Sequence, residues 1–270
     1  MRSMTRRSRI LACALALALF WPVGSGATTL YERSLAKLQA AIERVSPDDY
    51  CFVVLGDSQD NDEVFKKILA LVRTYRPLFI LHGGDYSNKG SDRETDNFLA
   101  MLEAIVPEAP VFVVVGNHEN KAVFSERIGP FHFTLDSAKL NLQVIALDNE
   151  SYILKDAELE YLRSGLAAKR ANTFVALHIP PRTERWSMHT FSAGADELTD
   201  ALAAHRVTAA FYFHIHLSAR DVIKGVPSII ASPAGGNLSM FDFPGQPVYH
   251  FVVVRVKDGK ATTEVVKLKE

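Results

Sequence analysis

Six side chains able to bind metal ions come directly after strand-like apolar runs. They are Asp57, Asp85, Asn117, His178, His214 and His216. Taken singly, each is explained by an ordinary turn, a helix cap or a packed histidine. Ligands, however, bind outside the carboxyl ends of parallel strands, and all six positions would fall at that edge of a parallel sheet. The sequence therefore predicts that these side chains, far apart along the chain, form one site.

The donor set indicates which ligand the site would hold. Two carboxylates, one amide oxygen and three imidazoles suit divalent ions such as Zn, Mn and Fe. Six donors are too many for one tetrahedral ion. They suffice for two ions that share a bridging carboxylate, as in two-metal phosphatases with ions ~3.5–4 Å apart. We therefore expect a centre for two divalent metal ions.

Alternating strand-like and helix-like segments would carry these side chains. Apolar runs of strand length cover residues 50–57, 78–85, 111–117, 140–149, 173–178 and 207–216. Between them, residues 62–75, 94–106, 156–169 and 195–206 have helical periodicity. This alternation predicts right-handed crossovers and parallel strands. The chain ends in a predicted hairpin at "KDGK". We expect one α/β domain over residues 28–270, with the sheet doubled into two layers and helices outside.

Residues 1–27 have the pattern of a secretory signal peptide. Four arginines precede the apolar run "ILACALALALFWPV", which is too short to span a bilayer comfortably at ~20 residues. Small residues near Ala27 suit cleavage. The segment predicts export to the periplasm or outside the cell, with no stable membrane span after cleavage; an uncleaved anchor is the alternative.

Charge and cysteine content exclude other classes. The chain has 30 basic and 31 acidic side chains, and removing the four arginines of residues 1–27 leaves 26 basic ones. This balance provides no basic surface for nucleic acid. Cys51 is the only cysteine in residues 28–270, so that segment cannot form an internal disulfide.

Five motifs in order resemble the calcineurin-like metallophosphoesterase superfamily, relatives of the purple acid phosphatases. They are "GDSQ" from Gly56, "GDYSN" from Gly84, "GNHE" from Gly116, "LHIPP" around His178 and "FHIH" from Phe213. The similarity extends from about Cys51 to His216 and beyond into the closing segment. It implies an αββα fold, a two-layer mixed β-sheet sandwich flanked by helices. It also implies hydrolysis of a phosphomonoester or phosphodiester, small or macromolecular, with two ions of Mn, Fe or Zn.

The resemblance assigns a role to each motif residue. Asp57 and His216 would hold the first ion, and Asp85 would bridge both. Asn117, His178 and His214 would hold the second ion. A hydroxide between the ions would attack phosphorus in line, and His118 would protonate the leaving oxygen or hold the phosphoryl oxygens.

The chain departs from the family pattern at three positions. Gln59 replaces a ligand histidine; its amide oxygen can coordinate, and we expect a preference for Mn or Fe over Zn. Phe213 replaces a glycine, which predicts a shifted loop and a narrower pocket. Asn88 replaces an aspartate, a milder change. In the loop after His178, Arg182 and Arg185 are candidates for binding substrate phosphate; a solvated surface loop is the alternative.

Two other functions compete with this one. "GDS" at Gly56–Ser58 also opens serine esterases of the GDSL type, with Ser58 as nucleophile. That class needs an Asp-x-x-His base, and none of the nine histidines has an aspartate three residues before it. The other alternative is a secreted metal-binding or adaptor protein that has lost catalytic activity, with Gln59 and Phe213 as the substitutions that mark the loss.

Overall fold

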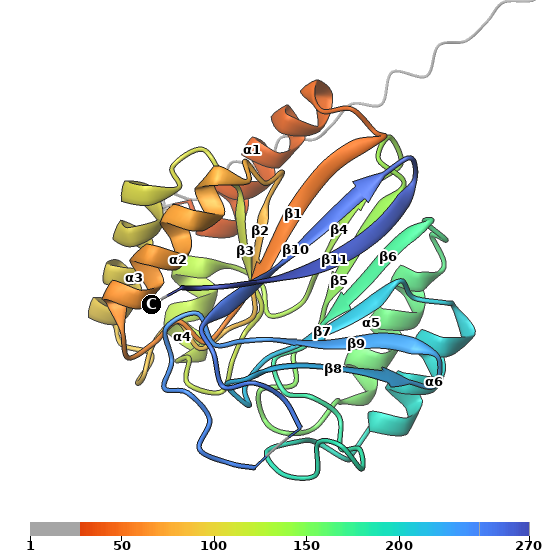
Figure 1. The fold of residues 1–270 in the computed structure, drawn as a ribbon. Coiled ribbons are helices and arrows are strands. Elements are labelled where there is room, and N and C mark those ends of the chain that lie inside the picture. The colour runs from red at the N-terminus through yellow and green to blue at the C-terminus, as the bar shows by residue number, and fades with distance from the viewer. Residues whose placement is uncertain (1–27, 243, 270) are drawn as a thin grey trace, which may run out of the picture.

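Two β-sheets face each other and helices cover their outer faces (Figure 1). The computed structural model describes residues 28–242 and 244–269. The predicted signal peptide lies outside the described residues. The two-layer mixed sandwich flanked by helices confirms the fold expected from the sequence.

The first sheet has the order β11-β10-β1-β2-β3. Its parallel strands are β1 (Asp49–Leu55), β2 (Ile80–His82) and β3 (Val111–Val113). The hairpin β10 (His250–Lys257) and β11 (Lys260–Lys267) adds two antiparallel strands beside β1. The carboxyl ends of β1, β2 and β3 therefore lie side by side.

The second sheet has the order β4-β5-β6-β7-β9-β8. Its parallel core is β5 (Leu142–Ala146), β6 (Asn172–Ala176), β7 (Ala209–Tyr212) and β9 (Val226–Ala231). Antiparallel strands close both edges, β4 (Phe133–Ser137) against β5 and β8 (Ser218–Ile223) against β9.

Helices from the two halves of the chain cover opposite outer faces (Figure 1). The first group is α2 (Asp62–Thr74) and α3 (Asp92–Ile105). Helix α1 (Leu30–Arg44) lies beside β3 and packs against the core between the sheets through Tyr31 and Leu38. The second is α5 (Asp156–Leu166) and α6 (Ala195–Ala204). A short helix α4 (Lys121–Val123) runs into a π-helical turn, Phe124–Ile128. In the described part of the chain, no helix is both long and apolar enough to cross a membrane.

Strand β1 shows why its sequence is apolar without a break. Phe52 and Val54 point into the core between the sheets. Val53 and Leu55 point the other way, into the layer under α2 and α3. Because successive side chains of a strand face opposite sides, a strand covered on both faces must be apolar throughout.

The sequence predicted most elements and missed those with weak patterns. All four predicted helices are present, and each predicted strand holds an observed one that ends before the polar residues of its motif. Helix α1, strand β4 and the β8–β9 hairpin were not predicted. Strand β4 is an edge strand in which buried residues (Phe133 and Leu135) alternate with more exposed ones. Helix α1 buries only a narrow stripe, Leu30, Ser34 and Leu38, so most of its residues are polar and its apolar period is weak.

Candidate metal centre

The loops after β1, β2 and β3 meet those after β6 and β7 at one edge of the sandwich. Four of the motif residues have left-handed backbone there: Asp57 (φ 52°), Asp85 (φ 53°), His214 (φ 68°) and His216 (φ 52°). Such backbone costs free energy for residues other than glycine and persists where the surrounding structure imposes it, often at functional sites. Tight turns at the strand ends thus aim these side chains into one region.

Asp57, His214 and His216 form one half of the site. Oδ1 of Asp57 lies 3.0 Å from Nε2 of His216, and Oδ2 accepts a hydrogen bond of 3.1 Å from the backbone N–H of His214. Nδ1 of His216 donates to the carbonyl of Asn237 at 2.5 Å. That bond fixes the tautomer and presents Nε2 toward Asp57, which is how second-sphere carbonyls orient metal-binding histidines.

Asp85, Asn117 and His178 form the other half. Nε2 of His178 lies 3.2 Å from Oδ2 of Asp85 and 3.0 Å from Oδ1 of Asn117. Nδ1 of the same ring donates to the carbonyl of Gly83 at 2.7 Å. Both His178 and His216 therefore offer Nε2 to the site while Nδ1 is held by backbone.

His214 joins the two halves. One potential ligand atom from each of Asp85, His178 and His214 lies within 4.8 Å of the other two. The Tyr152 hydroxyl lies 2.8 Å from Nε2 of His214, so Nδ1 is the ring nitrogen left for a metal ion. The structure thus brings together the six side chains that the sequence placed at separate strand ends.

Burial and facing opposite charges shift the pKa values of the side chains in this cluster. Burial works against the charged form of His178, but Asp85 outweighs it and raises its pKa to about 10. Likewise Asp57 overcomes burial of His216 and raises its pKa to about 9. Burial also works against the charged forms of Asp57 and Asp85, but the facing histidines outweigh it and hold both pKa values below the ordinary range. Burial lowers the pKa of His214 to about 3, so its ring stays neutral.

Two buried oxygens fit the expected cations. Oε1 of Gln59 and Oδ1 of Asp57 have no hydrogen-bond partner among the described residues, and the close approach of His216 to Asp57 is not aligned as a hydrogen bond. Buried oxygens without donors are rare because desolvation is costly. Two buried oxygens that accept no hydrogen bond, in a set of carboxylates and imidazoles, are what a divalent cation would satisfy. Gln59 therefore fits the role of a neutral oxygen ligand.

His118 lies at the rim of the cluster and is exposed. Its backbone N–H donates to Oδ1 of Asp85 at 3.0 Å, and its Nδ1 donates to the carbonyl of Asn88 at 2.9 Å. Nε2 remains as the nitrogen able to exchange a proton with a ligand. The position matches a proton donor beside the metal site and not a metal ligand.

Glu119 braces the two loops that carry Asp85 and Asn117. Its carboxylate accepts from the backbone N–H groups of Asp85, Tyr86 and Gly116 at 3.0, 3.0 and 2.7 Å. Burial and the Asp85 charge raise the pKa of Glu119 to about 8. They outweigh the backbone N–H donors, which favour the ionised carboxylate.

We expect Glu119→Gln to weaken metal binding on the order of 10–100-fold, the usual effect of losing an outer-sphere partner. The amide places an N–H₂ group against backbone donors and disturbs both loops. Titration of the metal-free chain with Mn²⁺ measures the effect. Exposed Glu103→Gln on α3 is the control; equal affinities for the two variants would show that Glu119 does not position the ligands.

Phe213 does not narrow the pocket, so that prediction is wrong. The side chain is fully buried in the core between the sheets. A Cβ built on Gly83 would lie 2.2 Å from the Phe213 ring, and one on Gly56 would lie 2.6 Å from it. The ring fills the space above the two glycines that precede the metal-binding loops. Bulk at position 213 is matched by the absence of side chains at positions 56 and 83.

Because the Phe213 ring packs on Gly83, substitutions at these two positions should have non-additive effects on stability. Gly83→Ala should destabilise the fold by about 3 kcal/mol, because overpacking a closed core forces neighbours out of place. In a Phe213→Ala background the same change should cost far less, with a coupling of about 1–3 kcal/mol. Urea unfolding of the four proteins measures both values. Additive effects would show that the ring does not rest on Gly83.

The two arginines predicted to bind substrate phosphate lie away from the cavity beside the metal site. Arg182 and Arg185 are exposed and do not line the cavity beside the metal site; their loop reaches the site through His189, whose ring centre is 6.0 Å from that of His214. Tyr152 and Asn237 also contact the site, and sequence reasoning missed them because no motif marks their loops.

Ser58 is not placed as an exposed nucleophile. It is 2% exposed, and its hydroxyl lies 2.9 Å from Nε2 of His82. Nδ1 of His82 accepts from the Gly84 N–H, so no carboxylate orients the ring, and burial lowers its pKa to about 3. The pair links the loops of Asp57 and Asp85 and lacks the features of a serine esterase.

Comparison with known proteins settles the family. A family model described as calcineurin-like phosphoesterase matches residues 51–218. The chain belongs to the calcineurin-like phosphoesterase family. The matched region contains all seven predicted ligands and His118. No curated protein sequence matched the chain.

Solved structures with the same fold differ widely in sequence. Purple acid phosphatase PPD1 from yellow lupin (Lupinus luteus) aligns with TM-score 0.67 and 14% identity, over 81% of this chain and 51% of that one. The chain thus spans about half the length of that protein. GAP50, described as the anchor in the inner membrane complex of Plasmodium, aligns with TM-score 0.63 and 15% identity, over 82% and 85%. A putative 5'-nucleotidase from Staphylococcus aureus aligns with TM-score 0.51 and 13% identity, over 82% and 55%.

Proposed function

We propose that this phosphoesterase hydrolyses a phosphomonoester or phosphodiester with two divalent metal ions. The observation that carries the proposal is the convergence of two His–Asp pairs, Asp57 with His216 and Asp85 with His178, beside the unpaired oxygen of Gln59. Asp57, Gln59 and His216 would hold one ion, Asn117, His178 and His214 the other, and Asp85 would bridge them. Mn, Fe and Zn suit these donors.

Bound ions would lower the pKa of water and neutralise charge on the phosphoryl group. The chain's own residues supply position and proton transfer, and positioning with charge stabilisation is most of what phosphoryl transfer needs. His118 is held through Nδ1 by Asn88, so Nε2 can protonate the leaving oxygen. Backbone carbonyls of Gly83 and Asn237 keep His178 and His216 aimed at the site.

The proposal includes export and a phosphoester substrate free in the periplasm or outside the cell. It rests on the sequence of residues 1–27 and on the lack of a basic excess for nucleic acid. Mass spectrometry of the protein recovered from the producing cell tests export. A mature chain that starts near Thr28 supports it, and an intact N-terminus in the cytoplasmic fraction would contradict it.

The activity is tested with p-nitrophenyl phosphate and bis(p-nitrophenyl) phosphate on metal-analysed protein. Turnover should disappear with a chelator, return with Mn²⁺ and resist a serine-directed fluorophosphonate. Inhibition by the fluorophosphonate alone would point instead to Ser58.

Gln59 makes a specific prediction about the metal. The amide oxygen is a harder donor than imidazole, so protein reconstituted in equimolar ions should take up Mn or Fe in preference to Zn at this position. Gln59→His should raise the Zn content relative to Mn. Metal analysis measures both; two tightly bound Zn per wild-type chain with no gain in Mn would overturn the preference.

A non-catalytic metal-binding or adaptor role is the second candidate. The neutral Gln59 ligand favours it, and the GAP50 anchor shows that this fold occurs in a protein described by a non-enzymatic role. Absence of measurable turnover in fully metal-loaded protein would favour this candidate.

A further inference from the structure

Exposed apolar side chains gather beside the metal centre. The described chain has six exposed large apolar side chains: Tyr152, Ile153, Met188, Val222, Met240 and Phe241. All but Val222 lie in three loops, 148–155, 182–191 and 237–242. We call these five the apolar collar. Exposed apolar groups scattered singly are normal, whereas a cluster marks a binding site.

Contacts around His214 bring the three loops together. The Tyr152 hydroxyl lies 2.8 Å from Nε2 of His214. The rings of His189 and His214 have centres 6.0 Å apart, and those of His189 and Phe241 are 4.8 Å apart. The backbone N–H of Leu154 donates to the carbonyl of Ala193. Two members of the apolar collar therefore adjoin a predicted metal ligand: Tyr152 contacts His214 directly, and Phe241 contacts it through His189.

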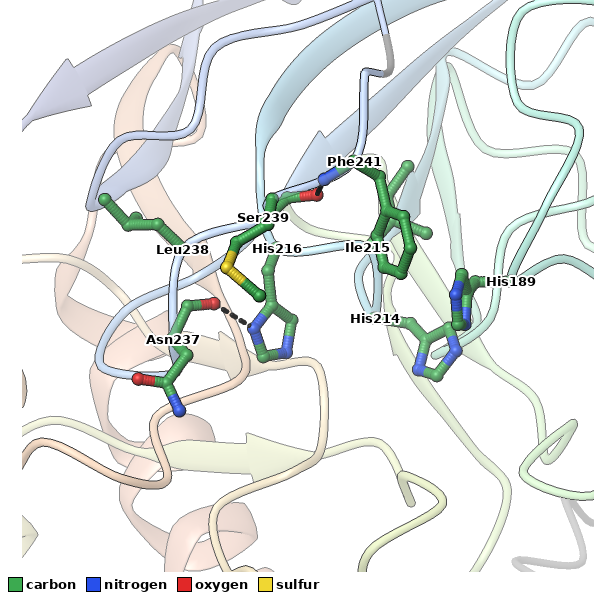
Figure 2. A pocket seen from close by; sticks show the side chains of 9 residues that line it. His189, His214, Ile215, His216, Asn237, Leu238, Ser239 and Phe241 are labelled. Atoms are coloured by element: carbon green, nitrogen blue, oxygen red, sulfur yellow. Dashed lines mark hydrogen bonds between the residues drawn. The ribbon is translucent and has the colours of Figure 1, made fainter.

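A cavity of about 230 Å³ lies between two members of the apolar collar, Met240 and Phe241, and the predicted ligands His214 and His216. It is lined by His189, His214, Ile215, His216, Asn237, Leu238, Ser239, Met240 and Phe241. Figure 2 shows His189 beside His214, Phe241 beside Ile215, and His216 bonded to Asn237. His214 and His216 are predicted ligands, so a group in this cavity lies next to the phosphoryl position. None of the nine lining residues is a lysine or arginine.

The size and chemistry of the cavity limit its occupant. Pockets for drug-sized ligands usually have ~300–1,000 Å³, so this one takes part of such a molecule, such as one ring or a short chain. Additional phosphates or carboxylates of a substrate would find no lysine or arginine on its walls, whose basic side chains are His189 and the two predicted metal ligands His214 and His216. An apolar group would find Ile215, Leu238, Met240 and Phe241.

We propose that this cavity binds the apolar organic group of the substrate, so that the natural substrates are phosphoesters of an aromatic or alkyl alcohol. The proposal rests on the proposed function and names its substrate class. Substrates that would bring additional anionic groups to the cavity are disfavoured, because its walls carry no lysine or arginine. The shared chemistry is an apolar chain beside a phosphate, either in a soluble ester or in a lipid at a surface.

Binding of alkylphosphonates tests the proposal separately from catalysis, because these analogues are not hydrolysed. Calorimetry with the Mn²⁺-loaded chain would compare methyl-, propyl- and hexylphosphonate. Each methylene that the cavity covers should tighten binding about fourfold, or about 15-fold from methyl to propyl. 2-Carboxyethylphosphonate, with a carboxylate in place of the last methyl group of propylphosphonate, should bind at least ~10-fold more weakly than propylphosphonate.

Two variants locate the effect. Met240→Ser should reduce the propyl-to-methyl ratio of affinities, and since the Met240 side chain is 98% exposed, its loss leaves the core intact. Val222→Ser, an exposed apolar residue on β8 outside the apolar collar, should keep the wild-type ratio. A ratio near one in the wild-type chain, tight binding of the carboxylate, or no phosphonate binding at all would overturn the proposal.

Sedimentation with phosphatidylcholine vesicles, with and without phosphatidic acid, distinguishes a lipid phosphoester from a soluble one. Binding that needs phosphatidic acid and is lost in Met240→Ser indicates a lipid phosphoester. Chain-length dependence without vesicle binding indicates a soluble ester. The turnover assays report on the proposed function independently, since an inactive chain that still prefers longer phosphonates would refute catalysis and retain the apolar site.

Discussion

Asp85→Asn should reduce hydrolysis of p-nitrophenyl phosphate or its diester on the order of 10³-fold, the scale of losing one preorganised charge-stabilising group. Asp85 is placed between the two halves of the described site: its carboxylate lies near His178 and His214, and its backbone carbonyl accepts from the N–H groups of Ser58 and Gln59 in the loop of Asp57. Asparagine keeps an oxygen that can accept the His118 N–H but loses the charge that would bridge two cations. Steady-state kinetics at saturating Mn²⁺ measure the loss.

The control for this variant is Asp48→Asn. Asp48 is exposed and precedes β1 at the end of the strand opposite Asp57, so the same chemical change should leave turnover at the wild-type rate. Metal analysis of Asp85→Asn should show fewer than two ions per chain. Wild-type turnover with two bound ions in Asp85→Asn would contradict the bridging role.

Metal binding should release about two protons at pH 7 from the histidine ligands His178 and His216. In the metal-free protein the pKa of His178 is about 10 and that of His216 about 9, so both rings are charged at neutral pH. A metal ion needs neutral imidazole and displaces a proton from each. Asp57 and Asp85, whose pKa values are lowered, are already ionised. Apparent affinity should therefore rise about tenfold per pH unit at each ion between about pH 7 and 9.

Calorimetry in buffers of different ionisation enthalpy counts the protons. His178→Gln should release one proton fewer than wild type. Zero net release at neutral pH would show that the two histidines are neutral in the metal-free chain.

The same pKa shifts fix how stability of the metal-free chain depends on pH. A histidine with a raised pKa in the folded state stabilises fully below its unfolded pKa of ~6.5, and that stabilisation is lost as pH rises toward about 9–10. The two aspartates, with lowered pKa values, stabilise above ~3.8 and lose this contribution in acid. Both the histidines and the aspartates therefore stabilise the metal-free fold between about pH 4 and 6.5, where its free energy of unfolding should be highest. Metal-loaded protein should show the opposite trend above neutrality.

The residues of the candidate site could be selected from the sequence because each follows a strand that is apolar throughout. A parallel strand buried on both faces, such as β1, leaves its first polar group at the carboxyl end, and parallel neighbours share that edge. The regular alternation of strands and helices likewise predicted parallel strands joined by helices, and the family resemblance added the two-layer sandwich. Elements without strong periodicity, such as α1 and edge strand β4, gave no comparable signal.

Tertiary structure alone decided what surrounds those strand ends. Phe213 follows the last paired residue of β7, and only packing shows that it points down onto Gly83 and away from the pocket. Tyr152, His189 and Asn237 lie in loops whose sequences have no period, so their approach to His214 and His216 depends on contacts across the whole chain. Strand periodicity is local and can be derived from residue order, whereas the meeting of three loops depends on how two sheets pack, which no local pattern encodes.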